Sequence, residues 1–274
     1  SYAAWTLWYL GYPDQGLKRS YEAVAVAEEL SHPLSLTEAL WFTASVHCLR
    51  REGQIAREQV EAAMTLATEQ GFPTWLAFGA IVRGWVLAEQ GQEEEGIRQM
   101  RQGMAAMQAT GSEAGKMFLT YLPEAYRRVG QTEEGLNMLA EALAFANKTG
   151  RRVDEAELYR LKGTLTLQSK TSLGQVSDKS QTSLEQVTTS QGKSQASLEA
   201  EAEECFWKAI EIARRQQAKS LELRVVMSLS RLWQRQGKKD EARQMLAEIY
   251  GWFTEGFDTK DLQEAKALLE ELNH

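Results

Sequence analysis

Histidine and cysteine are the side chains that most often bind metals or act as nucleophiles, and this chain has few of either. Its three histidines are His32, His47 and His274, and its two cysteines are Cys48 and Cys205. No HExxH or CxxC spacing is present, and adjacent residues such as His47 and Cys48 point to different sides of a helix. No G-x-S-x-G sequence marks a nucleophilic serine. We therefore expect no metal site, no cofactor and no catalytic residues.

Carboxylates occur in clusters, at Glu93–Glu95 and at Glu133–Glu134. Paired carboxylates can serve general acid–base catalysis. Both clusters fall in the expected first turn of a helix, however, where the helix dipole favours negative charge. This position accounts for them without catalysis, and we expect the chain not to be an enzyme.

Recurrent glycines reveal the elements that must position any functional side chain. Polar turns contain Gly11, Gly53, Gly91, Gly130 and Gly237. The first four follow one another at intervals of 42, 38 and 39 residues, and the last comes 107 residues after Gly130. Five residues beyond each turn glycine stand Gly16, Glu58, Gly96, Gly135 and Ala242. Four of these five are small, as the close approach of two helices requires.

A second break follows each turn glycine after 18 to 21 residues, at His32-Pro33, Gly71, Gly111 and Gly150. The segments between breaks have helical periodicity. Over Glu93–Ala109, for example, apolar residues recur at three- and four-residue steps, at Ile97, Met100, Met104 and Met107. Each unit is therefore predicted to be a helix, a glycine turn, a longer helix and a second turn.

The segment Ser169–Ala196 interrupts this pattern. Of its 28 residues, 16 are serine, threonine or glutamine, which is too polar a composition to bury a core. We expect an insertion between the two helices of one unit. An ordered excursion is the alternative, because Leu173, Val176, Leu184 and Val187 could line a thin helical stripe.

Composition limits the partners of the chain. The net charge of −7 argues against general binding to nucleic acid or to anionic membranes. No apolar run is long enough to cross a bilayer, and no signal peptide precedes the first helix. Two distant cysteines in apolar helical patterns are typical of free buried thiols, which suits a cytoplasmic location. Because the chain starts at Ser1 inside an expected helix, we expect a fragment of a longer protein.

The glycine turns and their period resemble tetratricopeptide repeats, and this resemblance implies that the first helix of each unit lines the concave surface of the array, where partners bind. Residues two, three and six positions before each turn glycine should face inward, with Arg224 one layer further back. The partner-binding candidates obtained in this way are Trp5, Trp8, Tyr9, His47, Arg50, Arg51, Trp85, Glu124, Arg127, Arg128, Arg224, Arg231 and Arg235.

These candidates are rich in arginine and tryptophan. Arginine binds carboxylates and phosphates through paired hydrogen bonds, and tryptophan anchors partners in interfaces. Structural roles are the alternative. The dipole at a helix C-terminus favours basic residues in the last turn, and tryptophans pack between helices. The sequence leaves both explanations open.

Four aromatic residues near the end of the chain are expected to form a cap. Tyr250, Trp252, Phe253 and Phe257 surround a glycine-containing turn before a final helix, Thr259–Asn273. A solenoid must cover its exposed terminal face. We therefore expect these aromatic side chains to hold the closing helix against the last unit.

The turns and their period resemble tetratricopeptide repeats, with units longer than the usual length. Four runs of the sequence resemble the carboxy-terminal region of large bacterial signalling ATPases. They are YLGYPDQGL from Tyr9, GFPTWLAFGAIVRGWVLAEQGQ from Gly71, EAELYRLKG from Glu155 and AKSLELRVVMSLSRLWQRQGKKDEARQMLAEIYGWFTEGFDTKDLQEAKALL from Ala218. Those proteins often carry an adenylate/guanylate cyclase or other output domain, then an ATPase module, then this array. The resemblance covers nearly all of the chain except the insertion. It implies a sensor or scaffold arm and transfers no catalysis.

Taken together, these patterns predict an all-α, α-α superhelix of about six helix pairs and a capping helix. It would form a single solenoid domain over residues 1–274, with repeats at 1–32, 33–71, 72–111, 112–150, 151–217 with its insertion at 169–196, and 218–256, and with the capping helix at 259–273. The expected function is a non-catalytic, protein-binding regulatory module of a bacterial signal-transduction protein, holding a partner domain or an acidic peptide in its groove. The alternative is a sensor that binds a small anionic metabolite.

Overall fold

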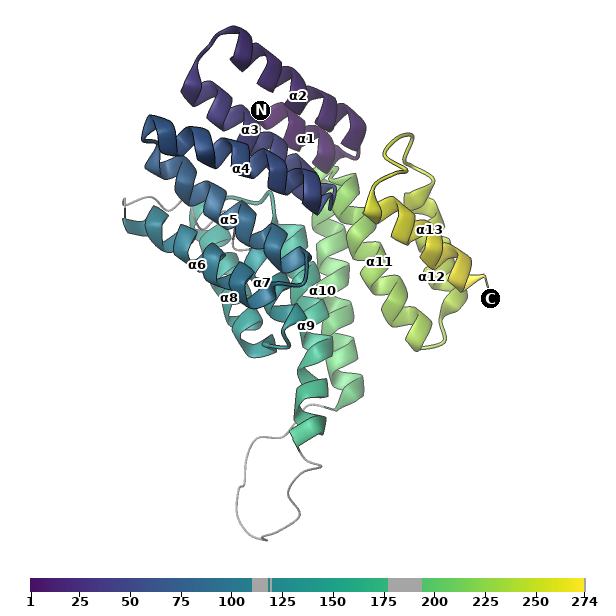
Figure 1. The fold of residues 1–274 in the computed structure, drawn as a ribbon. Coiled ribbons are helices and arrows are strands. Elements are labelled where there is room, and N and C mark those ends of the chain that lie inside the picture. The colour runs from purple at the N-terminus through teal and green to yellow at the C-terminus, as the bar shows by residue number, and fades with distance from the viewer. Residues whose placement is uncertain (110–117, 119, 177–193, 274) are drawn as a thin grey trace, which may run out of the picture.

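The structure, a computed structural model, describes residues 1–109, 118, 120–176 and 194–273, and over these residues it is built from helices without strands. Figure 1 shows them as successive antiparallel pairs followed by one final helix. The helices are α1 (Tyr2–Leu10), α2 (Pro13–Glu29), α3 (Pro33–Leu49), α4 (Gly53–Gln70), α5 (Pro73–Glu89), α6 (Glu93–Ala109), α7 (Tyr121–Arg128), α8 (Thr132–Thr149), α9 (Glu155–Val176), α10 (Gln195–Gln216), α11 (Lys219–Arg235), α12 (Lys239–Tyr250) and α13 (Lys260–Leu272). The predicted all-α class, with six pairs and a closing helix, is confirmed.

Proline and left-handed residues set the helix boundaries. Pro13, Pro33 and Pro73 each open a helix, at the position where a missing N–H costs no hydrogen bond. Gly11 ends α1 with a φ of 94° and donates its N–H to the carbonyl oxygen of Trp8 at 3.0 Å. The predicted break at Gly111 lies outside the described residues.

The turn of the second pair differs from the sequence expectation. Its left-handed residue is Arg51, with a φ of 63°, and Gly53 is already the first residue of α4. The alignment of this unit on Gly53 is therefore wrong by two residues. The shift explains why Glu58 is exposed, whereas Ala56, five residues beyond Arg51, is fully buried.

Small residues allow the two helices of a pair to approach closely. In the third pair, a Cβ atom placed on Gly84 would lie 2.6 Å from the carbonyl oxygen of Gly96. In the first pair, a Cβ atom on Gly16 would lie 2.8 Å from the carbonyl oxygen of Ala4. Both distances are shorter than any normal contact, so these positions exclude every larger residue.

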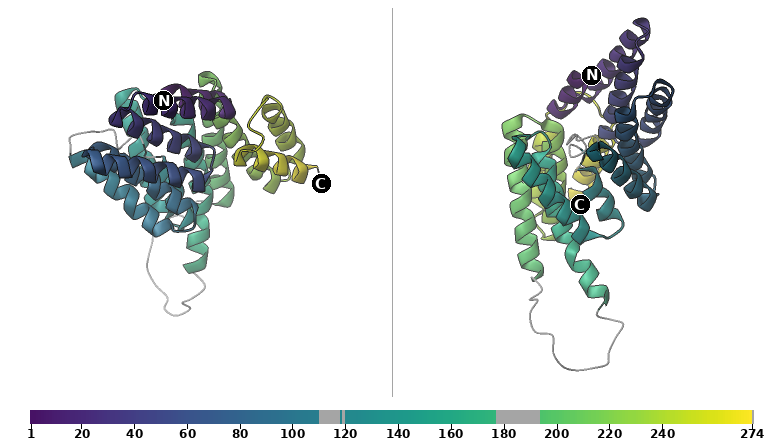
Figure 2. Two further views of the ribbon diagram at one scale, coloured as in Figure 1. Left: turned by 45° about the horizontal axis from the view of Figure 1, so that its top comes forward. Right: turned by 90° about the vertical axis from the view of Figure 1, so that its left-hand side faces the viewer.

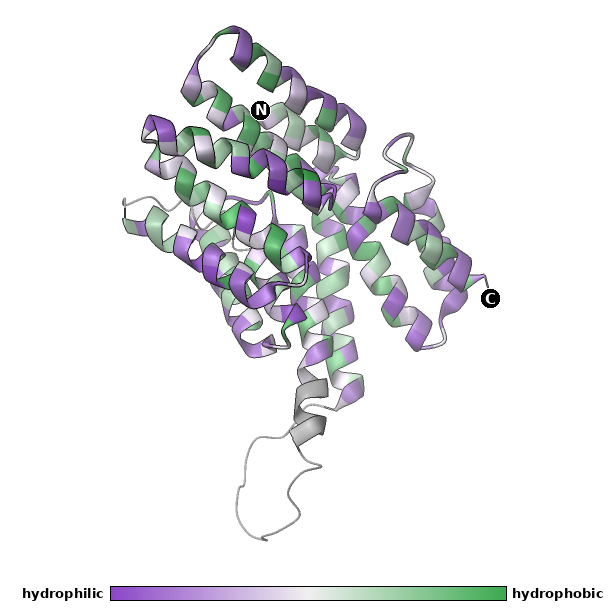
Figure 3. Cartoon of the chain, in the orientation of Figure 1, coloured by the Kyte–Doolittle hydropathy of each residue, from purple (hydrophilic) through white to green (hydrophobic). Residues whose placement is uncertain are grey.

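Apolar contacts continue from one pair to the next instead of forming one central core, as expected for a solenoid. Trp41, Ile81 and Met100 belong to a cluster shared by α3 to α7, and Phe206 and Leu229 belong to one shared by α10 to α13. Figure 3 shows apolar and hydrophilic residues side by side along the helices. None of the described helices is long and apolar enough to span a bilayer.

The array bends until its first and last pairs meet (Figure 2). Helix α1 lies against α11, where the Ser220 hydroxyl donates to the carbonyl oxygen of Trp8 at 2.5 Å. Trp8 is buried here together with Ile212 and Leu221 of the later pairs. The solenoid therefore closes on itself through this contact between its first and last pairs.

A second set of contacts, which we call the clasp, joins residues 252–264 to the first three helices. One carboxylate oxygen of Glu255 accepts hydrogen bonds from the backbone N–H groups of Asp14 and Gln15, each at 3.0 Å, and so caps the start of α2. The buried guanidinium of Arg50 reaches Asp14 at 2.9 Å and Asp258 at 3.1 Å. The clasp thus links residues that lie more than 200 positions apart in sequence.

The aromatic cap is organised differently from the sequence expectation. Phe253 is buried in the same cluster as Leu262 of α13, as expected for a residue that holds the closing helix. Trp252 instead packs against Tyr12 of the first pair, with ring centroids 5.6 Å apart. Phe257 is half exposed, so part of the predicted cap belongs to the clasp.

The predicted insertion is shorter than expected at its start. Helix α9 continues through residues 169–176, and α10 begins at Gln195, so both helices of this pair extend into the polar segment. In Figure 1 the two helices project beyond their neighbours. The stripe positions Leu184 and Val187 lie outside the described residues.

Replacing Gly96 by alanine tests the close approach within the third pair. The added methyl group meets the backbone of α5, and overpacking of this kind should lower the free energy of unfolding by about 3 kcal/mol. Gly53→Ala is the matched control, because the nearest atom to its new Cβ lies 4.0 Å away. Chemical denaturation measures both. Equal stability of the two variants would contradict the packing described here.

Replacing Arg50 by alanine tests the clasp. The change leaves Asp14, Glu52 and Asp258 without their shared cation, and we expect a loss of about 2 kcal/mol, less than for a fully buried pair because the carboxylates reach solvent. The control is Arg19→Ala, which removes only an exposed pair with Glu22 and should cost below about 1 kcal/mol. Urea denaturation measures the free energy of unfolding of both variants. Similar losses of this free energy in both would show that the clasp contributes little to stability.

Candidate binding cavity

A cavity of about 580 Å³ lies inside the closed array. Every odd-numbered helix from α1 to α13 contributes to its wall, and α10 adds Phe206. This volume is within the range of small-molecule sites in proteins. The cavity is the concave surface of the solenoid, narrowed into a pocket by the contact between the first and last pairs.

One part of the wall is aromatic. Trp5, Trp85, Phe118 and Tyr121 line it, and the rings of Trp85 and Tyr121 lie 5.9 Å apart. Burial raises the pKa of Tyr121 well above its usual value, so its hydroxyl stays protonated at neutral pH. This region offers flat apolar surface together with one hydroxyl group.

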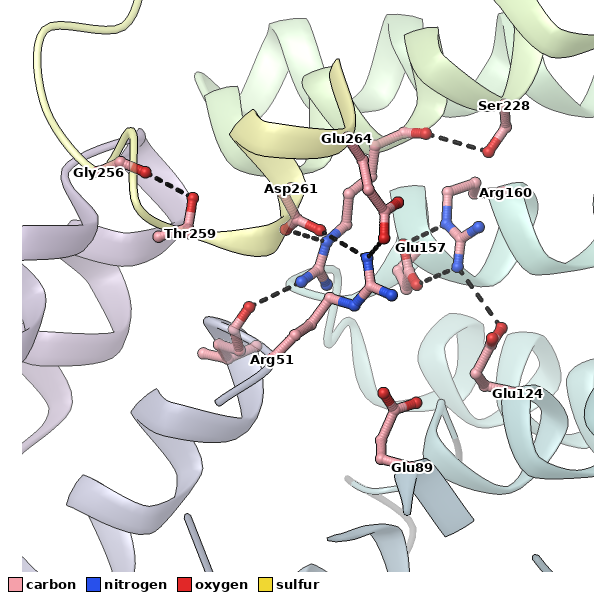
Figure 4. Close-up of polar contacts among 12 residues, drawn as sticks. Arg51, Glu89, Glu124, Glu157, Arg160, Ser228, Gly256, Thr259, Asp261 and Glu264 are labelled. Atoms are coloured by element: carbon pink, nitrogen blue, oxygen red, sulfur yellow. Dashed lines mark hydrogen bonds and ion pairs between the residues drawn. The ribbon is translucent and has the colours of Figure 1, made fainter. Parts of the chain in front are cut away.

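A group of ion pairs lines the cavity, and Figure 4 shows Glu124, Glu157 and Arg160 of this group. Glu124 of α7 accepts hydrogen bonds from Arg127, the shorter at 2.8 Å, and lies 3.8 Å from Arg160 of α9. Arg160 pairs with Glu157 at 2.7 Å, and Arg128 pairs with Glu89. These contacts tie α5, α7 and α9 together around the cavity.

Burial and neighbouring charges shift the pKa of Glu124 in opposite directions. Burial alone would raise the pKa of its carboxyl group. The hydrogen bond from Arg127 and the positive charges of Arg160 and Arg128 outweigh it, and the pKa is lowered overall. Glu124 is therefore ionised at neutral pH.

At Asp154 burial outweighs the neighbouring groups, so the pKa of its carboxyl group is raised. Its carboxylate accepts a hydrogen bond from the Tyr9 hydroxyl at 2.6 Å, and its Arg151 contact is longer, at 3.5 Å. Burial raises the pKa of Asp154, and the Tyr9 and Arg151 contacts only reduce that rise. Burial and the Asp154 charge also raise the pKa of Tyr9.

The closing helix α13 supplies two carboxylates to the same cavity (Figure 4). Asp261 accepts a hydrogen bond from Arg224 at 2.7 Å, and Glu264 accepts one from Arg51, also at 2.7 Å. Arg224 further donates to the carbonyl oxygen of Leu49 at 2.7 Å. The cavity wall and the clasp therefore share residues, so closure of the array and the shape of the cavity depend on each other.

The structure brings most of the predicted groove residues together. Ten of them line the cavity, namely Trp5, Tyr9, Arg51, Trp85, Glu124, Arg127, Arg128, Arg224, Arg231 and Arg235. Whether they bind a partner stays a prediction. Trp8 lies behind this wall, and its ring packs beneath the Arg224 guanidinium at 4.7 Å.

His47 and Arg50 do not line the cavity, and the two-residue shift in the second turn is the reason. His47 contacts the Tyr21 hydroxyl and the Glu52 carboxylate, at 3.0 and 2.5 Å. Arg50 belongs to the clasp. Counting from Arg51 instead of Gly53 selects Leu49, Cys48 and Ser45, of which Leu49 and Cys48 line the cavity.

Sequence reasoning missed several cavity residues. Arg160, Glu157 and Asp154 belong to the fifth pair, in which no turn glycine follows the first helix because the insertion lies there. Aligning EAELYRLKG with the first helices of the other units would have found Glu157 and Arg160, which lie in that run, but not Asp154, which precedes it. Asp261 and Glu264 come from the closing helix, and their position depends on closure of the array, for which the sequence carries no local signal.

The described part of the wall has no arrangement suited to nucleophilic or metal catalysis. The cysteine among the described lining residues is Cys48. Burial raises the pKa of its thiol well above the usual value, which keeps the sulfur in the protonated, unreactive thiol form. No histidine is among the described lining residues. No described cluster of histidine, cysteine and carboxylate groups could hold a metal ion. What the arrangement can do is bind, through aromatic surface and guanidinium groups.

Two isosteric substitutions should respond oppositely to pH. Because the folded-state pKa of Glu124 is lowered, its stabilisation is present above the ordinary pKa of about 4.3 and is lost as pH falls through the lower folded-state value. Glu124→Gln should thus lower the free energy of unfolding at pH 7, and the loss should become smaller as the pH is lowered. The folded-state pKa of Asp154 is raised, so its ionisation opposes folding as pH rises from about 3.9 through the folded-state value.

Asp154→Asn should accordingly gain stability, relative to the unmodified chain, as pH is raised from 4 to 7. Denaturant titrations of both variants at several pH values measure these trends. The same direction of change for Glu124→Gln and Asp154→Asn would refute the electrostatic description of the cavity.

No family model and no curated protein matches this sequence. Similar solved structures exist at low sequence identity. The apo form of RapI has a TM-score of 0.57 at 11% identity, over 98% of this chain and 80% of RapI. BtubC (BKLC) from P. vanneervenii has a TM-score of 0.51 at 13% identity, over 95% of this chain and 89% of BtubC.

A putative kinesin light chain from Podosopora anserina, described as having TPR-like repeats, has a TM-score of 0.49 at 17% identity, over 80% of this chain and 95% of that protein. At such identities the likeness concerns the fold. Thirteen described helices, stacked as six successive pairs and a closing helix, together with the likeness to RapI and BtubC, make the chain a TPR-like helical repeat solenoid.

Proposed function

We propose that this chain is a non-catalytic binding module whose central cavity holds a small anionic ligand. The observation that carries the proposal is the composition of the wall. Its described residues include eight arginines and six carboxylates beside aromatic surface, although the chain as a whole has a net charge of −7. A positive excess inside an acidic protein favours an anion by electrostatic attraction.

Closure of the array supports a small ligand over a whole partner domain. A domain or a long peptide needs an open groove, whereas α1 lies against α11 and the clasp ties α2 and α3 to the end of the chain. A short acidic end of a partner protein is the second candidate. It is supported by the side chain of Arg231, which lines the cavity and is 49% exposed, so that a partner segment can reach it from outside.

The wider role that we propose is regulatory. The sequence runs quoted above resemble the repeat arrays of bacterial signalling ATPases, in which such a module would pass a binding event to an output domain. A cytoplasmic location is part of this proposal, and the two free, buried cysteines are consistent with it. An intramolecular partner domain would be the receiver of the signal.

Filling the cavity tests the proposal. Ser228 of α11 lines the cavity, and Ser228→Trp places a large side chain there. We expect a panel of organic anions and short acidic peptides to contain compounds that raise the melting temperature of the unmodified chain but not that of Ser228→Trp.

The control is Thr65→Trp, at an exposed helical position on α4, away from the described cavity wall. It should respond to ligands as the unmodified chain does. If every active compound stabilises Ser228→Trp equally, the cavity is not the binding site. If no compound acts on the unmodified chain, the small-ligand proposal fails.

A further inference from the structure

One face of α11 carries a row of polar side chains into the cavity. Arg224, Ser228, Arg231 and Arg235 all line it, and their spacing of four, three and four residues places them on the same side of a helix. The dipole at the C-terminus of α11 favours basic residues in its last turn. It does not require them to face the cavity, so their orientation needs another explanation.

The arginines of the cavity differ in how far their charge is already neutralised. Arg51, Arg160 and Arg224 each have a carboxylate partner at 2.7 Å. Arg231 reaches only Glu264, at 3.5 Å, and Glu264 is held more closely by Arg51. Arg235 makes no ion pair or hydrogen bond with the part of the chain that the structure describes. Within this row the uncompensated positive charge therefore lies at its end; elsewhere in the wall Arg151 has a similarly long contact, 3.5 Å to Asp154.

Arg231 and Arg235 also repel each other. Like charges four residues apart on a helix are destabilising, and here both side chains face the same space. An anion between them would remove the repulsion and would accept hydrogen bonds from two guanidinium groups. Such charge-assisted hydrogen bonds to carboxylate or phosphate are among the strongest in proteins.

The aromatic part of the wall comes from other helices, with Trp5 on α1, Trp85 on α5 and Tyr121 on α7. It supplies apolar surface but no charge. A ligand that used both regions would combine an unsaturated or aliphatic body with an anionic group. Arg160 already has Glu157 as a close partner, at 2.7 Å, and so has less positive charge to offer a further anion.

We propose that Arg231 and Arg235 form the anion subsite of the cavity, and that the ligand is an amphipathic organic anion whose apolar part lies against apolar side chains of the cavity wall. This deepens the proposed function and rests on it. The anion is a carboxylate or a phosphate, because both fit a pair of guanidinium groups.

Four probes test the subsite: phenylacetate, phenyl phosphate, the neutral analogue benzyl alcohol, and inorganic phosphate. Binding to the full chain is measured by isothermal titration calorimetry at fixed ionic strength. We expect at least one aromatic anion to bind at least tenfold more tightly than benzyl alcohol and inorganic phosphate. The tighter of phenylacetate and phenyl phosphate identifies the anionic group.

The decisive variant is Arg231→Gln/Arg235→Gln, which should weaken that binding at least tenfold. Its matched control is Arg215→Gln/Arg243→Gln, which removes the same charge from exposed positions on α10 and α12 outside the described cavity wall and should leave binding unchanged. Circular dichroism verifies that both variants fold.

Each outcome has a distinct meaning. Equal binding by the unmodified chain and Arg231→Gln/Arg235→Gln, with binding abolished in Ser228→Trp, overturns the anion subsite and leaves the cavity as the binding site. Binding that survives in Ser228→Trp overturns the proposed function as well. Absence of binding by all four probes to the unmodified chain overturns the amphipathic-anion assignment.

Discussion

Contact between the first and last helix pairs is the constraint on which the rest of the structure depends. A solenoid of six pairs would otherwise present an open concave surface. Here Trp8 is buried against the later pairs, and Arg50 and Glu255 join helices at opposite ends of the chain. The inner wall becomes a cavity for this reason. The same contact brings α13 to the wall, where Asp261 and Glu264 neutralise Arg224 and Arg51.

The charged wall is costly to build and has to be stabilised locally. Removing charges from water carries a large penalty, which only close partners can offset. Arg160 therefore lies between Glu157 and Glu124, and Arg128 lies beside Glu89. A protein under no functional demand would reach the same stability with apolar side chains. The guanidinium groups of the wall, and above all their excess over carboxylates, are the basis of the proposal that the cavity binds an anion.

Local signals in the sequence predicted the repeat well. Glycines such as Gly96 mark close helix approach, and left-handed turns and prolines mark the helix ends, because these effects depend on nearest neighbours only. The same reasoning failed at Arg51, because this residue adopts the left-handed conformation that glycine usually takes. The prediction therefore placed His47 and Arg50 in the groove, which they do not line. Closure could not be predicted. It depends on small rotations summed over all pairs, and its contacts join residues more than 200 positions apart.

The most direct test of this account is the distance between the two ends of the array in solution. Spin labels at the exposed positions Lys18 of α2 and Lys266 of α13, with both native cysteines replaced by alanine, allow it to be measured by double electron–electron resonance. A closed array predicts one narrow distribution below about 30 Å, because each label lies within two helical turns of the clasp. A broad distribution centred at longer distances would show an open solenoid and would contradict the contact between the first and last pairs.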